Sequence, residues 1–99
     1  MPDGNLFAVI RTRGPQWQHS LPLESQENWA GHAAFMNALQ MDGFVVLGGP
    51  LDGTHDVLLI VRANTREEIV DRLQADPWVA SDHLRIARVA PWVIRLGSL

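Results

Sequence analysis

His32 is the residue of this sequence whose type and surroundings best suit acid–base chemistry. It lies in a stretch, residues 29–43, with the apolar spacing of a helix. Residues three, four and seven apart share a helix face, so His32 lies in one stripe with Phe35, Met36 and Leu39. A titratable ring among apolar neighbours needs a buried partner, and catalytic bases are often built at such positions. Taken by itself, the segment favours the alternative, a core histidine that hydrogen-bonds to the backbone.

Asp76 is the second residue at a position that local rules disfavour. It follows a predicted helix, where a carboxylate meets the negative end of the helix dipole at a cost of a few tenths of a kcal/mol. Two interactions could offset this cost, and both can occur at once. Asp76 can cap a short turn that begins at Pro77, which is worth about 1 kcal/mol. It can also bind one imidazole nitrogen of His32, fixing the tautomer and raising the basicity of the ring.

Composition limits the classes of protein to which the chain can belong. It has 99 residues, 8 Lys and Arg against 11 Asp and Glu, a net charge of −3 and no cysteine. Without a basic run, nucleic acids and anionic membranes are poor partners. The N-terminus has no apolar signal region, and no apolar run approaches the roughly twenty residues of a membrane span. We therefore expect a cytoplasmic protein with one domain, residues 1–99.

Metal and cofactor sites are not predicted. The absence of cysteine excludes thiolate sites and cysteine nucleophiles. Beside Asp76, the side chains that could bind a metal are four histidines: His19, His32, His55 and His83. None of their pairs has the short helical or turn spacing that brings two ligands to one ion. We therefore expect no metal site.

The order of the predicted elements is β-α-β-β-α-β. Apolar runs and turn residues predict strands over residues 6–13, 44–47, 56–63 and 84–94, the last with an edge or bend at Pro91. The first helix runs from near Glu27 to Met41, with N-cap chemistry from Ser25 and Asn28. Thr65 and Glu68 form a capping box that starts the second helix, and residues 48–53 have turn chemistry throughout.

This order is typical of a ferredoxin-like α+β fold, a four-stranded antiparallel sheet with two helices on one face. The second and third strands do not alternate apolar and polar residues, so both of their faces should be buried. Two helices can cover only one face. A chain this small buries only about two-thirds of its unfolded surface. We therefore expect a homodimer formed through the second sheet face.

The connection over residues 14–28 shows no period and is long for a compact domain. It contains Trp17, whose indole must either pack down or cover something. A lid and a loop held down by one tryptophan are both compatible with this pattern.

Several short motifs occur together in one order along residues 6–95. They are His32, Gly43, the run Gly48-Gly49-Pro50, the run Asp76-Pro77-Trp78 and the run Val89-Ala90-Pro91-Trp92. In order and spacing they resemble the YCII-related (YciI-like) family. The resemblance implies a dimeric α+β barrel and an acid–base site of His32 and Asp76, with Asp42 as a weaker candidate beside its reading as a solvated helix end. The chain departs from the family in the long 14–28 loop and in the Trp29-Ala30-Gly31 run before the histidine.

The resemblance also implies a type of reaction. Related proteins, among them a dehydrochlorinase of aromatic degradation, carry out cofactor-free proton transfer beside a carbonyl group, a task suited to a neutral imidazole. The sequence thus predicts an isomerase, lyase or dehydrochlorinase that acts on a small cyclic or aromatic acid. One alternative is a non-catalytic small-ligand-binding or accessory domain. Another is that His32 is purely structural.

Substrate-binding residues are predicted from residue type and strand parity. Trp17, Trp29 and Trp78 could form an apolar wall for a small ring. Arg88 has the parity of Leu84 and Ile86, so it could anchor a substrate carboxylate from the apolar sheet face. A surface arginine is the alternative reading of Arg88.

Overall fold

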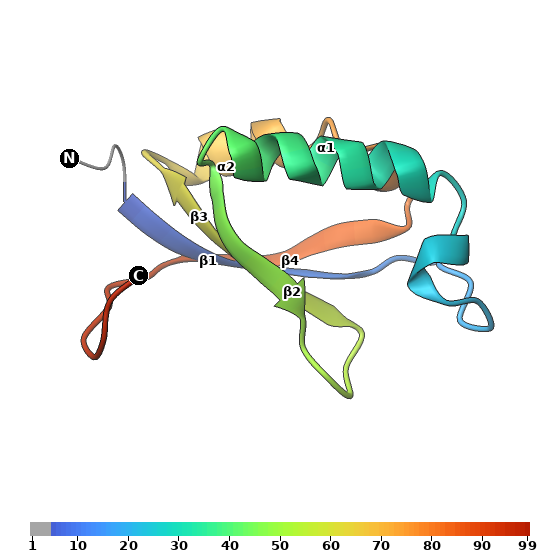
Figure 1. The fold of residues 1–99 in the computed structure, drawn as a ribbon, viewed down its shortest axis with the longest axis horizontal. Helices are drawn as coiled ribbons and strands as arrows, with labels where there is room; N and C mark the ends of the chain where they lie inside the picture. The colour runs from blue at the N-terminus through green and yellow to red at the C-terminus, as the bar shows by residue number, and fades with distance from the viewer. Residues whose placement is uncertain (1–4) are drawn as a thin grey trace.

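The computed structural model describes residues 5–99, which form a four-stranded sheet with helices on one side (Figure 1). The elements in chain order are β1 (Asn5–Arg13), η1 (Leu23–Ser25), α1 (Trp29–Met41), β2 (Val45–Pro50), β3 (Asp56–Ala63), α2 (Arg66–Leu73), α3 (Pro77–Ala80) and β4 (Leu84–Pro91). The sheet order is β2-β3-β1-β4, and all three pairs are antiparallel. The predicted ferredoxin-like α+β fold is confirmed. The short helix η1 was not predicted, whereas α3 is the short turn beginning at Pro77 that Asp76 was expected to be able to cap.

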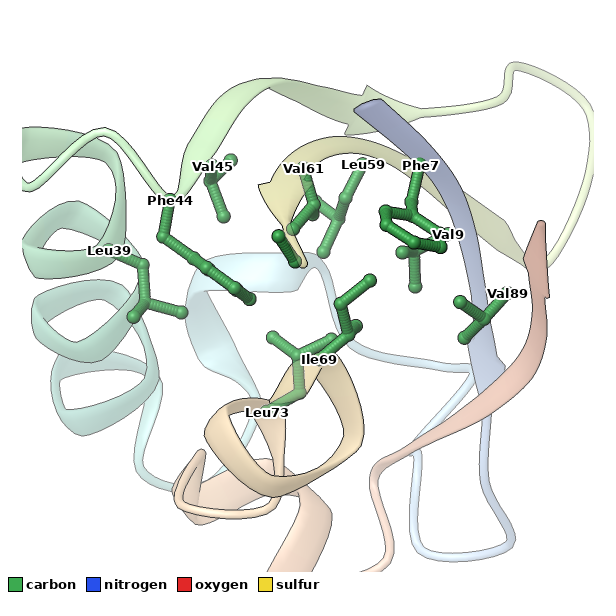
Figure 2. Packing of buried hydrophobic residues seen from close by; sticks show 11 residues of the cluster. Phe7, Val9, Leu39, Phe44, Val45, Leu59, Val61, Ile69, Leu73 and Val89 are labelled. Carbon is green, nitrogen blue, oxygen red and sulfur yellow. The ribbon is translucent and has the colours of Figure 1, made fainter. Parts of the chain in front are cut away.

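The core lies between the sheet and helices α1 and α2 (Figure 2). Alternate residues of the central strands face it, for example Phe7 and Val9 on β1. Ile69 and Leu73 of α2 are fully buried against them. Each such side chain contributes about 1.5–3 kcal/mol by leaving water. The predicted stripe of α1 is also confirmed, because its apolar members pack on this core.

The two helix starts differ in how well the sequence predicted them. The α2 capping box is confirmed: Thr65 Oγ1 accepts a hydrogen bond from the Glu68 backbone N–H at 3.1 Å. The Glu68 carboxylate reaches back to the N–H of Asn64. The predicted side-chain cap of α1 is wrong. Ser25 lies in η1, and Asn28 has a left-handed backbone (φ 57°) with no capping side-chain bond.

Strand β2 continues through the Gly48–Pro50 run that the sequence assigned to a turn. It is an edge strand, where proline is tolerated because one row of backbone groups has no partner strand. A Cβ at Gly48 would lie 2.7 Å from a side-chain methyl group of Leu59, so a larger residue here would require that side chain to move. The turn begins only after Pro50 and includes Gly53, at φ +78°.

A register shift in β4 reverses the predicted orientation of Arg88. Along the β1–β4 pair, Arg11 is opposite Ile86 whereas Ile10 is opposite Arg88, so one extra β4 residue lies between the two pairs. Such a bulge reverses the alternation of faces. Val89 is therefore buried and Arg88 exposed. The prediction that Arg88 shares the apolar face of Ile86 is wrong, and β4 ends at Pro91, earlier than predicted.

Among residues 5–99, no helix packs on the second face of the sheet (Figure 1). Leu47 of β2 is 53% exposed on this face. A hollow of about 310 Å³ lies here, lined by Leu47, Gly48, Gly49, Pro50, Leu51, Leu58 and Ile60. In the described part of the chain, none of the helices combines the length and apolar character that crossing a bilayer requires.

Candidate functional site

Three elements bring ionisable side chains together beneath the helices. His32 comes from the inward face of α1, Arg11 from the C-terminal half of β1, and Asp76 from the corner between α2 and α3. All three are largely buried, with exposed fractions of 8%, 1% and 0%. The two interactions that could offset the cost at Asp76 occur together, because it contacts His32 and also caps α3. Its Oδ1 accepts a hydrogen bond from the Trp78 backbone N–H at 2.9 Å.

Asp76 contacts one ring nitrogen of His32 with both carboxylate oxygens. Nδ1 lies 3.0 Å from Oδ1 and 2.9 Å from Oδ2. Burial raises the pKa of Asp76, but hydrogen bonds from His32, the Trp78 N–H and Arg11 outweigh it and leave that pKa below its ordinary value. Asp76 is then ionised and can only accept hydrogen bonds. Nδ1 of His32 therefore carries the proton and donates, which leaves the lone pair of a neutral ring on Nε2.

Arg11 is the member of this cluster that sequence reasoning missed. Its Nη1 donates to Asp76 Oδ2 at 2.8 Å, and its Nη2 contacts the Met36 sulfur at 3.3 Å. Within the described residues its buried Nε has no hydrogen-bond partner. The sequence pattern could have identified it, because strand alternation places Arg11 on the same face as Phe7 and Val9. A charged residue at the inward parity of a core strand points to a buried partner.

Trp78 fixes the orientation of the His32 ring. The two rings stack with centroids 3.9 Å apart and planes 9° from parallel. The Trp78 indole N–H donates to the Glu27 carbonyl oxygen at 2.6 Å, which ties α3 to the chain before α1. Trp17 packs on Trp78 edge to face at 5.3 Å, and Trp29 lies 5.9 Å from His32. The predicted tryptophans thus lie around the histidine.

A cavity of about 440 Å³ opens beside this cluster. That volume is within the range of small-molecule sites. Its polar lining includes His32, Arg11 and Arg13. Its apolar lining includes Trp17, Leu23, Trp29, Met36, Val45, Pro50, Val57, Leu59, Trp78 and Leu84. The 14–28 loop therefore packs down through Trp17, and it also forms part of the cavity wall.

Comparison with known proteins agrees with this architecture. The sequence matches the family model of the YCII-related domain over residues 6–93. The chain belongs to the YCII-related family. The resemblance carried by the motifs of residues 6–95 is thereby confirmed. Comparison with curated proteins gives no significant match.

A solved structure has the same fold as this YCII-related protein. It is 5-chloro-2-hydroxyhydroquinone dehydrochlorinase (TftG) from Burkholderia phenoliruptrix AC1100, in complex with 2,5-dihydroxybenzoquinone. The two chains are 24% identical and superpose with a TM-score of 0.61. The alignment covers 93% of this chain and 95% of the dehydrochlorinase chain. At this level of identity the comparison establishes the fold.

Two of the predicted site residues lie apart from the cluster. Asp42 follows the last turn of α1 and forms an exposed ion pair with Arg72, at 2.6 Å. It is ten residues beyond His32, about 15 Å along the helix axis. Arg88 is exposed on the other side of the sheet. The structure therefore does not bring Asp42 or Arg88 to His32 and Asp76.

The other histidines of this YCII-related chain occupy separate places. His19 and His55 lie close on the surface, with ring centroids 5.1 Å apart. His83 is buried beneath Trp78, and its Nδ1 lies 2.7 Å from the Ser81 hydroxyl. Among residues 5–99, no group of three or more side chains is arranged to hold a metal ion.

Proposed function

We propose that this YCII-related protein is a cofactor-independent acid–base enzyme of the isomerase, lyase or dehydrochlorinase type. Its substrate is a small cyclic or aromatic acid. One observation carries the proposal: His32 lines the cavity while its Nδ1 is held by both oxygens of a buried, ionised Asp76. The dehydrochlorinase fold of the similar structure is consistent with such a role.

In the proposed reaction, Nε2 of His32 is the general base. It removes a proton from substrate carbon or oxygen next to a carbonyl group, and the ring becomes an imidazolium. Asp76 stabilises that cation and keeps the ring in the productive tautomer. The stack with Trp78 holds the ring plane during the transfer. A positioned base of this kind contributes roughly 10²–10⁴-fold to the rate.

The fate of the electron pair distinguishes the three reaction types. In an isomerisation, the imidazolium returns the proton to another atom of the same molecule. In a lyase reaction, the pair left by the proton expels a leaving group and forms a new double bond. In a dehydrochlorination that group is chloride, so the substrate loses one proton to His32 and one chloride ion to solvent. No external oxidant or reductant is required.

The proposal predicts that turnover depends on His32. The wild-type protein and His32→Gln are incubated with 5-chloro-2-hydroxyhydroquinone, an acidic phenol, and with a small unsaturated lactone that carries a carboxylate, and chloride release and ultraviolet absorbance are followed. We expect wild-type turnover of at least one compound and a loss of about a hundredfold or more in His32→Gln, because the base is gone. Asp42→Asn is the matched control, since its exposed carboxylate lies away from the cavity, and it should keep wild-type turnover.

Other results would favour the alternatives. Saturable ligand binding with no turnover by the wild type would favour a non-catalytic binding or accessory domain. A His32→Gln protein that is less stable, yet binds and turns over substrate as the wild type does, would make His32 a structural residue.

We also propose that the chain forms a homodimer through its open sheet face. Leu47, Leu51 and Ile60 line an apolar hollow on that face, and exposed apolar patches of this kind mark interfaces. Sedimentation equilibrium at micromolar concentration should give the mass of a dimer. Leu47→Asp should shift the equilibrium towards monomer, because two copies would bury a carboxylate in the contact. A wild-type monomer at that concentration would contradict the proposal.

A further inference from the structure

We propose that Arg13 binds the carboxylate of an aromatic acid in the cavity that His32 lines. The inference deepens the proposed function by naming the residue that recognises the acid. The sequence assigned this task to Arg88, which lies exposed on the other side of the sheet. Arg13 lines the cavity itself.

The cavity wall includes a cation that can pair with an anionic ligand. Its ionisable lining residues are Arg11, Arg13, His32, His55 and Asp56. The charge of Arg11 is matched by Asp76, 2.8 Å away. Arg13 forms no ion pair with any of residues 5–99, so its charge is not matched in the same way. The half-buried guanidinium of Arg13 therefore remains available to an anion of the ligand, whereas the Asp56 carboxylate on the same wall would repel one.

Stacking on Trp17 prepares Arg13 to bind a carboxylate. The central guanidinium carbon lies 4.6 Å from the centre of the Trp17 ring. This contact holds one face of the planar group and fixes the side chain in place. The N–H donors at the guanidinium edge form the fork that pairs with both oxygens of a carboxylate.

Aromatic contacts connect Arg13 to the proposed base. Arg13 stacks on Trp17, Trp17 packs edge-on against Trp78, and Trp78 stacks on His32. Each link is a contact between buried or half-buried groups. The anion-binding group and the imidazole are therefore held in one packed unit, which sets the distance between the two ends of a bound ligand.

The spacing suits an aromatic acid. Arg11 and Arg13 are two residues apart on the same face of β1, which is about 7 Å along the strand. Arg11 marks the His32–Asp76 end of the cavity, because it binds Asp76 directly. A benzene ring with one carboxylate substituent has a similar length. A ligand held at Arg13 by its carboxylate would thus extend its ring towards His32.

The test compares two ligands of the same size, benzoate and benzamide, by NMR titration of the full chain. We expect the wild type to bind benzoate at least about tenfold more tightly, as a charge-assisted pair with Arg13 implies. Arg13→Gln should reduce that preference to about twofold or less and leave benzamide affinity nearly unchanged, since benzamide has no charge with which the guanidinium could pair. Arg88→Gln is the matched control and should keep the wild-type preference.

Three results would overturn the assignment: equal affinity of the wild type for both ligands, a full preference for benzoate in Arg13→Gln, or no binding of either ligand. The measurement does not depend on turnover. His32→Gln should keep the preference for benzoate, because Nε2 takes no part in binding the carboxylate. If the wild type catalyses nothing while the preference follows Arg13, the proposed enzyme function fails and the anion site remains.

Discussion

Replacing Asp76 by alanine is expected to lower the free energy of unfolding by about 3–5 kcal/mol. The substitution leaves the guanidinium of Arg11, which is 1% exposed, without its carboxylate partner. It also removes the N-cap of α3, worth about 1 kcal/mol. Domains of this size have a total stability of about 5–15 kcal/mol. Urea denaturation followed by circular dichroism, at one fixed protein concentration, measures the loss.

A double-mutant cycle isolates the buried charge pair. Arg11→Met removes the cation, so in the double variant Arg11→Met/Asp76→Ala no unpaired charge remains. The combined loss should be smaller than the sum of the single losses by about 1–3 kcal/mol. The exposed pair Arg72 and Asp42 is the matched control, with an expected coupling below about 1 kcal/mol. Additive losses at Arg11 and Asp76 would contradict the proposed dependence of one charge on the other.

Should the alanine variant not fold, Asp76→Asn provides the same comparison with the side-chain shape retained.

The pKa of Asp76 is below its ordinary value of 3.8, mainly because the bonds from His32, the Trp78 N–H and Arg11 outweigh the effect of burial. Below about pH 4 the unfolded chain therefore binds a proton that the folded protein does not, and stability falls as the pH falls. The stability difference between wild type and Asp76→Asn should accordingly shrink below that pH. A stability difference between the two proteins that stays constant down to pH 3 would contradict the lowered pKa of Asp76.

The fold was predictable because its signals are local and repeated. The stripe of α1, the capping box at Thr65 and the apolar run of β1 each predict one element, and their order admits few topologies. The errors occurred where a tertiary contact decides a local choice. Gly48 and Gly49 have turn chemistry, yet they pair with β3 as an edge strand. The bulge that turns Arg88 outward has no signal in the residue types of β4.

The candidate site was predictable only in part. Residue types and family motifs identified His32 and Asp76, but Arg11 was missed because its strand was considered only as an apolar run. Strand alternation would have placed both Arg11 and Arg13 inward. A charged side chain at an inward position of a core strand requires a partner or a ligand. Arg11 has its partner in Asp76, whereas the proposed partner of Arg13 is the ligand.

Asp76→Asn is expected to reduce turnover by roughly 10²–10⁴-fold while the protein still binds ligand. In the wild type an ionised carboxylate can only accept, so Nδ1 of His32 carries the proton and Nε2 is free to act as the base. The asparagine amide can instead donate to Nδ1, which moves the ring proton to Nε2 and blocks it.

The tautomer of His32 can be measured directly. Nitrogen NMR of labelled histidine should report the proton of the neutral His32 ring on Nδ1 in the wild type and on Nε2 in Asp76→Asn. Benzoate affinity is the control for an intact cavity, and it should change little because Arg13 is untouched. An Asp76→Asn protein with the wild-type tautomer and wild-type turnover would mean that Asp76 only caps α3 and balances the charge of Arg11. The contact with both carboxylate oxygens would then have no role in proton transfer.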